Sequence, residues 1–147
     1  MKILVVGCAG FVGSNVINTL TNLIDIDLEG QVSNTFDVFG VDNMQFGYAD
    51  NVKVNNWSRC GFETLTENYL NDFDVLVHLA TANIIYAMDE PIKTFKTNAF
   101  DTIELFRKFK GKIIYTSIWN WRRDRSDERL IRVATPPLGS RRRRAIS

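Results

Sequence analysis

Three glycines near the N-terminus have the spacing of a phosphate-binding loop. Gly7, Gly10 and Gly13 occupy every third position, directly after the apolar run 2–6. Phosphate binding needs a tight turn, a backbone without Cβ atoms in the way, and the free N–H groups that begin a helix. A strand before the glycines and a helix after them would make this short motif specific. The spacing predicts a bound dinucleotide pyrophosphate; the alternative is a glycine-rich turn without a ligand.

An acidic residue is expected to hold the sugar that adjoins the pyrophosphate. Asp42 ends the apolar segment 37–41, and a carboxylate there can accept hydrogen bonds from both ribose hydroxyls of adenosine while repelling the 2′-phosphate of NADP. It follows the loop by more than the roughly 20 residues usual for this motif, and the polar segment 25–36 takes up the extra length. We therefore expect NAD rather than NADP; the alternative is a surface carboxylate that caps a turn with Asn43.

Alternating strands and helices must position these residues. Four apolar runs predict buried parallel strands: 2–6, 37–41, 74–79 and 112–116. A weaker fifth strand is predicted over 52–54. Apolar residues at helical spacing predict helices over 14–23 and 91–110, and a polar helix is predicted over 63–70. Residues 25–36 are predicted to form an irregular connection. The alternation predicts an α/β fold, a Rossmann-like doubly wound parallel sheet that stops after about the fourth or fifth strand.

Composition favours one globular domain. The chain has 147 residues, of which 45% are hydrophobic and 12% aromatic, enough for a single core. No apolar run approaches the roughly 20 residues that a membrane span needs. Two cysteines, Cys8 and Cys60, give no disulfide framework. We expect a cytoplasmic protein without a metal site.

The basic residues divide the chain at about residue 118. Residues 1–121 carry a net charge of −5, whereas residues 122–147 contain nine Arg, no Lys and three acids, a net of +6. We therefore predict a folded domain over 1–117 and an Arg-rich tail over 118–147. Three explanations of the tail stay open: a truncated or frame-shifted product, a basic arm that binds nucleic acid or another anionic surface, or a solvated end without a partner.

Five segments, in order, resemble the extended short-chain dehydrogenase/reductases, the NAD-dependent sugar-nucleotide epimerases and dehydratases. The glycine loop resembles the family's GxxGxxG motif. The others are 41–44 (VDNM), 74–80 (DVLVHLA), 91–98 (PIKTFKTN, followed by Thr102 and Leu105) and 112–117 (KIIYTS). Together they cover nearly all of the predicted domain, so the resemblance applies to the N-terminal part of such an enzyme.

The resemblance implies a role for each matching residue. Phe11 and Val12 would join the glycines beside the pyrophosphate, and Asp42 with Asn43 would hold the adenosine ribose. Leu79, Ala80 and Thr81 would pass beside the cofactor, and Asn98 would lie near its nicotinamide half. From the residues alone, His78 is expected to be a satisfied core histidine and Asn98 a polar surface residue.

The departures from the family concern catalysis. The family's Ser/Thr position falls on Ile118, which leaves Ser117 and Thr116 as weak candidates, and no Tyr-x-x-x-Lys pair follows: the last tyrosine is Tyr115 and the last lysine Lys112. An acid that the family has near the adenine is also absent between residues 51 and 62.

Three hypotheses about function follow. The chain is the NAD-binding portion of a nucleotide-sugar epimerase or dehydratase and is inactive by itself, or it is an enzyme completed by another chain or by Tyr115. The third is a non-enzymatic module that senses NAD or binds nucleic acid through its basic arm. We favour the first, with a nucleotide-sugar substrate in the parent enzyme and neither a nucleic acid nor a membrane partner. An open sheet edge after residue 117 also predicts homo-oligomers, or an edge covered by the tail.

Overall fold

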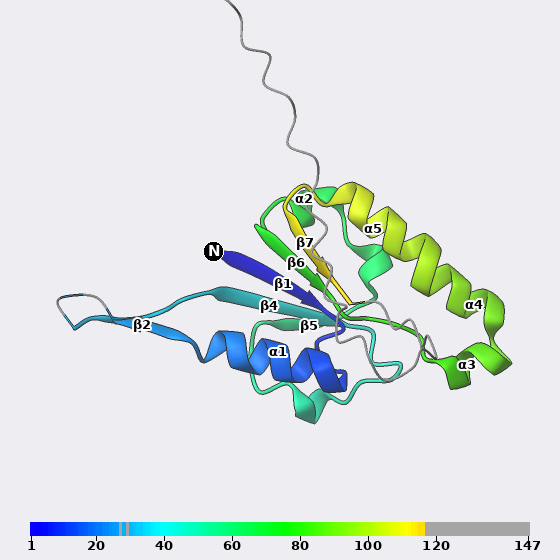
Figure 1. Ribbon diagram of the computed structural model, residues 1–147, viewed down its shortest axis with the longest axis horizontal. Helices are drawn as coiled ribbons and strands as arrows, with labels where there is room; N and C mark the ends of the chain where they lie inside the picture. The colour runs from blue at the N-terminus through cyan, green and yellow to red at the C-terminus, as the bar shows by residue number, and fades with distance from the viewer. Residues whose placement is uncertain (27, 29, 117–147) are drawn as a thin grey trace, which may run out of the picture.

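A five-stranded parallel sheet forms the centre of the molecule (Figure 1). The computed structural model describes residues 1–26, 28 and 30–116. In spatial order the strands are β5 (Trp57–Arg59), β4 (Asp37–Asp42), β1 (Lys2–Val6), β6 (Val75–His78) and β7 (Lys112–Tyr115). Every neighbouring pair is parallel. From β1 the chain adds β4 and β5 on one side, then returns to add β6 and β7 on the other. The predicted Rossmann-like sheet is confirmed, and its topological switch point lies at the carboxyl end of β1.

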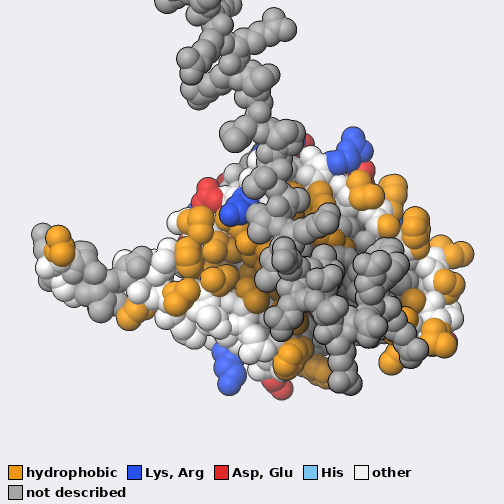
Figure 2. All heavy atoms as spheres, in the orientation of Figure 1, with side chains coloured by type: hydrophobic (Ala, Val, Ile, Leu, Met, Phe, Trp, Pro, Cys, Tyr) orange, Lys and Arg blue, Asp and Glu red, His pale blue; other side chains and the backbone are white. Residues whose placement is uncertain are grey.

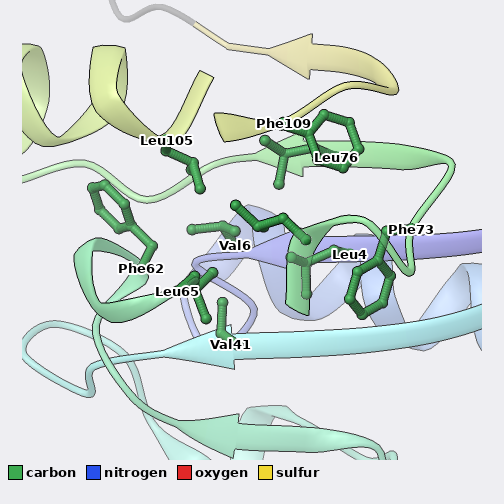
Figure 3. Packing of buried hydrophobic residues seen from close by; sticks show 10 residues of the cluster. Leu4, Val6, Val41, Phe62, Leu65, Phe73, Leu76, Leu105 and Phe109 are labelled. Carbon is green, nitrogen blue, oxygen red and sulfur yellow. The ribbon is translucent and has the colours of Figure 1, made fainter. Parts of the chain in front are cut away.

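Both faces of the sheet are buried, which explains why the strands read as continuous apolar runs. Along β1, Leu4 and Val6 pack into one cluster, whereas Ile3 and Val5 pack into another. Helix α5 (Thr102–Lys108) covers the first cluster through Leu105 (Figure 3). Helix α1 (Phe11–Thr21) covers the second through its buried Ile17.

The helices differ from the predicted segments in their bounds. Helix α1 begins at Phe11, three residues before the predicted start, because the glycine loop leads straight into it. The predicted helix 63–70 is a 3₁₀ turn, η2 (Phe62–Thr64), followed by the short α2 (Glu67–Leu70). Between them Thr66 caps α2 by accepting a hydrogen bond from the N–H of Tyr69.

The predicted helix 91–110 has three parts and ends two residues early. These are α4 (Pro91–Phe95), a π-helical stretch η3 (Lys96–Asp101) and α5. One further helix, α3 (Ile84–Asp89), precedes them and was not predicted. Its apolar residues are mostly exposed, so the helix has no buried face whose periodic spacing could be recognised in the sequence.

Two predictions about the connections were wrong. Instead of an irregular segment, residues 25–36 contribute to an antiparallel ribbon of β2 (Ile24–Ile26) and β3 (Val32–Asn34), which extends from the body of the molecule (Figure 1). The weak strand at 52–54 is a loop that follows the 3₁₀ turn η1 (Ala49–Asn51), and the fifth strand is β5. Val52 and Val54 pack against the α1-side core instead, which accounts for their apolar character.

Exposed apolar side chains gather along the outer edge formed by α3, α4 and α5 (Figure 2). Ile84, Met88, Ile92 and Phe95 are each at least 70% exposed. None of the helices in the described part of the chain has the length and apolar composition needed to cross a membrane.

The chain's single histidine is buried at the end of β6. His78 is fully buried among aromatic rings, with Tyr115 stacked at 5.7 Å and Phe62 edge-on at 4.9 Å between ring centroids. Because the Thr102 hydroxyl donates to the carbonyl of Thr97 (3.0 Å), it accepts from the His78 Nε2–H at 3.1 Å. Within the described residues Nδ1 has no partner, so the predicted satisfied histidine is satisfied at one nitrogen only. Burial lowers the pKa of His78 to about 4.

This lowered pKa predicts a pH-dependent stability. The unfolded chain binds a proton at His78 near pH 6.5, whereas the folded chain binds one only near pH 4. The free energy of unfolding should therefore keep its maximal His78 contribution above pH 6.5. It should then fall by up to about 3 kcal/mol as the pH drops towards 4. Denaturant titrations of the wild type and of His78→Phe isolate this contribution from that of the carboxylates. Equal pH slopes in the two proteins would contradict the prediction, as would a histidine NMR signal that titrates near pH 6.5 in the folded chain.

Candidate functional site

The glycine loop joins the middle strand β1 to α1, and two of its glycines permit close backbone contacts. Gly7 has a φ of +84°, and a Cβ there would lie 2.6 Å from the Ala80 nitrogen. A Cβ on Gly13 would overlap the carbonyl oxygen of Gly7. Only glycine at these positions lets the first turn of α1 lie directly against the loop and the loop against the chain after β6.

Hydrogen bonds within the protein use the N–H groups of the loop itself. Those of Gly7 and Cys8 donate to the Val41 carbonyl at 2.9 and 3.3 Å, and that of Gly10 donates to the Gly7 carbonyl at 3.3 Å. The N–H of Ala9 donates to the Asp42 carboxylate at 2.9 Å. The loop is therefore held rigidly by the neighbouring strand β4, and its own donors are already engaged.

Among the described residues, the N–H groups that begin α1 have no hydrogen-bond partner. An α-helix leaves its first N–H groups without partners inside the helix, and here these belong to Phe11, Val12 and Gly13. Gly10 at the cap position has no side chain to satisfy them, and the first turn holds no acidic residue. The positive end of the helix dipole is thus open to an anion. Phe11 and Val12 offer only backbone groups, because their side chains are exposed and do not line the groove described next.

A groove opens at the switch point between the carboxyl ends of β4, β1 and β6. Its empty space amounts to about 570 Å³, a figure that includes space open to solvent. Seven of the predicted site residues line it: Gly7, Gly10, Asp42, Asn43, Leu79, Ala80 and Thr81. Gly13 is buried in the first turn of α1 and does not line the groove.

Asp42 connects the glycine loop to the loop that follows β4 and keeps acceptor capacity for a ligand. Its Oδ2 accepts from the N–H of Ala9 (2.9 Å) and its Oδ1 from the N–H of Met44 (2.8 Å). Each carboxylate oxygen carries two lone pairs, so each can accept one further hydrogen bond. Asn43, by contrast, is exposed and its Oδ1 accepts from the N–H of Gln45 (2.9 Å), forming a local turn.

Asn98 holds the loop that follows β6. Its Oδ1 accepts from the N–H of Ala82 at 2.7 Å and its Nδ2 donates to the Ala82 carbonyl at 2.8 Å. Asn98 lies in the π-helical stretch η3, a widened turn of the kind often found at functional sites. Asn98 therefore supports the groove wall through Ala82 and does not itself line the groove. It is half-buried, so it is not the polar surface residue expected from the residues alone.

Two aromatic side chains meet across the site. Phe46, in the loop after β4, lines the groove and packs edge-on against Tyr86 of α3, with 5.2 Å between ring centroids. Sequence reasoning missed both residues, as it missed Cys60 and Phe62 at the end of β5. Cys60 and Phe62 follow β5, a strand that was not predicted, and Tyr86 lies on α3, a helix that was not predicted, so no sequence signal singled these residues out.

Of the two weak catalytic candidates, the structure describes only Thr116. Thr116 follows β7, is exposed and is not among the lining residues. Ser117 and the tail lie outside the described residues. In the part of the chain that the structure describes, no group of three or more His, Cys, Asp or Glu side chains is arranged to hold a metal ion.

A parallel sheet with this strand order, a glycine loop leading into α1 and an acid at the end of β4 define a Rossmann-type domain. Sequence comparison agrees with this class. The chain is 32% identical to UDP-glucuronic acid decarboxylase 5 of Arabidopsis thaliana over 126 residues, which is 80% of this chain and 33% of the relative. Decarboxylase 6 of the same plant is 31% identical over the same extent. The chain thus spans about a third of the length of these curated relatives.

Solved structures show the same fold. UDP-N-acetylglucosamine 4-epimerase from Methanobrevibacter ruminantium, in complex with UDP-N-acetylmuramic acid, superposes with a TM-score of 0.65 at 22% identity, over 88% of this chain and 44% of that one. UDP-glucose 4-epimerase from Thermus thermophilus, in complex with NAD, gives a TM-score of 0.58 at 24% identity, over 74% and 33%. No family model matches the chain. The resemblance to the extended short-chain dehydrogenase/reductases is confirmed, for the N-terminal part of such proteins.

The close contact at Gly13 predicts a sharp difference between two glycines. Gly13→Ala should lower the free energy of unfolding by at least about 2–3 kcal/mol, because its methyl group meets fixed backbone. Gly10→Ala is the matched control: its Cβ would have only the Gly7 oxygen near it, at an ordinary 3.4 Å. Denaturant unfolding of both variants measures the difference. Similar stabilities for the two would show that α1 does not lie against the loop as described.

Proposed function

We propose that this chain binds NAD at the groove and is the cofactor-binding portion of a nucleotide-sugar-modifying enzyme. The observation that carries the proposal is that two complementary binding features lie together at the switch point of the sheet. The N–H groups of Phe11 and Val12, which have no partner in the described part of the chain, suit a pyrophosphate, and the carboxylate of Asp42 suits a ribose. The NAD complexes among the structural neighbours support this choice of cofactor.

The proposed arrangement follows the order of the strands. The pyrophosphate would lie over the start of α1, and the adenosine ribose would be held by the remaining lone pairs of Asp42, whose negative charge disfavours NADP. The other half of the cofactor would extend along Leu79, Ala80 and Thr81, a wall kept in place by Asn98. Bound NAD supplies hydride transfer; the residues described here supply binding and orientation.

We further propose that the chain holds the cofactor without turning over a sugar nucleotide by itself. Residues 118–147 contain neither a tyrosine nor a lysine, so the general-base pair that the family resemblance implies is lacking from this chain. The names of the relatives support a UDP-sugar as the substrate of the complete enzyme. Two cysteines that remain free thiols agree with a cytoplasmic location, which stays part of the proposal.

Calorimetric titration with NAD tests the proposal, and Gly10→Ala sharpens it. The wild type should bind NAD, and the added methyl group should weaken binding about tenfold or more because it keeps the pyrophosphate from the start of α1. Stability should remain within about 1 kcal/mol of the wild type. An absence of heat with NAD from folded wild-type protein would overturn the proposal. Turnover of a UDP-sugar by the purified chain would overturn its catalytic part.

The open edge of the sheet predicts self-association. Among the described residues β7 pairs only with β6, so its outer backbone groups can pair with another strand. Light scattering from micromolar to millimolar concentration should give a mass above the 16.8 kDa of one chain. A monodisperse monomer throughout that range would contradict this prediction and leave NAD binding unaffected.

A further inference from the structure

We propose that the groove beside Cys60 recognises a purine base by its shape and tolerates a change of its 6-substituent, because a thiol is too weak a hydrogen-bonding group to tell the two substituents apart. The inference rests on the proposed binding of a dinucleotide. It concerns a residue at the carboxyl end of β5 that lines the groove but takes part in neither pyrophosphate nor ribose binding. The ligand class it implies is a dinucleotide with either adenine or hypoxanthine as its base.

The strand order places the base. Strands β1, β4 and β5 are consecutive neighbours in the sheet, and adjacent strands lie about 4.8 Å apart. With the pyrophosphate at the end of β1 and the ribose at Asp42 on β4, the base attached to that ribose must lie next to it, over the end of β5. Cys60 directly follows β5 there, and Phe62 lies two residues further on.

The walls at this end are apolar apart from one thiol. Val41 and Phe62 are buried, and Phe46 adds a third apolar side chain from the facing loop. Cys60 is half-buried, and this burial raises the pKa of its thiol; a hydrogen bond with Thr64 opposes the shift, and the Glu63 charge adds a smaller increase. Its sulfur is therefore uncharged at neutral pH and is only a weak donor and acceptor.

The polar side chains nearby are already engaged or face water. Asp42 binds two backbone N–H groups and keeps its other lone pairs for the ribose. The Oδ1 of Asn43 accepts from the N–H of Gln45, and the side chain of Gln45 is exposed at the rim. Strong rejection of a ligand requires a buried polar group that the wrong ligand leaves unpaired. No such side chain among the described lining residues faces the base.

The direct test compares NAD with nicotinamide hypoxanthine dinucleotide, in which an oxygen replaces the 6-amino group. The wild type and Cys60→Ser should bind the two within about threefold of each other. Cys60→Asp should prefer NAD by about tenfold or more, because a carboxylate accepts from the amino group and repels the oxygen. Discrimination above tenfold by the wild type would overturn the inference alone. Failure of both dinucleotides to bind would overturn the proposed function.

A second experiment tests the position of Cys60 independently. Alkylation of the folded chain, followed by mass analysis of its peptides, should modify Cys60 and be slowed at least about fivefold by saturating NAD. Cys8 is the internal control, because it is fully buried and burial raises the pKa of its thiol to about 12, so it should stay unmodified. Bound NAD that leaves the Cys60 rate unchanged would place the base elsewhere and overturn the inference.

Discussion

The structure depends on how closely the first turn of α1 approaches the glycine loop. A side chain at Gly13 would overlap the Gly7 carbonyl, and one at Gly7 would collide with the backbone at Ala80. The same two positions therefore fix α1 against β1 and bring the chain after β6 beside the loop. Since β1 is the middle strand, this contact sets the spacing of all three elements around the switch point.

The hydrogen bonds of the loop explain how a rigid scaffold still leaves donors for a ligand. Its N–H groups from Gly7 to Gly10 are all engaged within the protein, so the loop keeps its shape without a bound anion. The donors left over belong to the start of α1, where the dipole is also positive. Asp42 combines both tasks, because it fastens the loop and retains lone pairs that face the groove.

The sequence was informative where one residue type has a single physical use. The glycine spacing and the buried runs identified the loop, the central strands and Asp42, because parallel strands and tight turns tolerate few alternatives. The family resemblance, not the pattern, named Leu79, Ala80 and Thr81 on the groove wall. Strands β2, β3 and β5 were not predicted, because each has only three residues, too few to show a clear period. Phe46, Cys60 and Tyr86 were missed because their roles arise only when distant loops meet across the groove.

The buried histidine connects the core to the groove wall. His78 at the end of β6 donates to Thr102, whose hydroxyl in turn donates to the carbonyl of Thr97 in η3. This chain of hydrogen bonds occupies a carbonyl within the widened turn, and the next residue, Asn98, grips Ala82 on the loop beside the site. Because only a neutral imidazole is compatible with the unpartnered Nδ1 in this aromatic pocket, its protonation would disturb the wall as well as the core. The stability of the sheet and the shape of the binding groove therefore share one buried network.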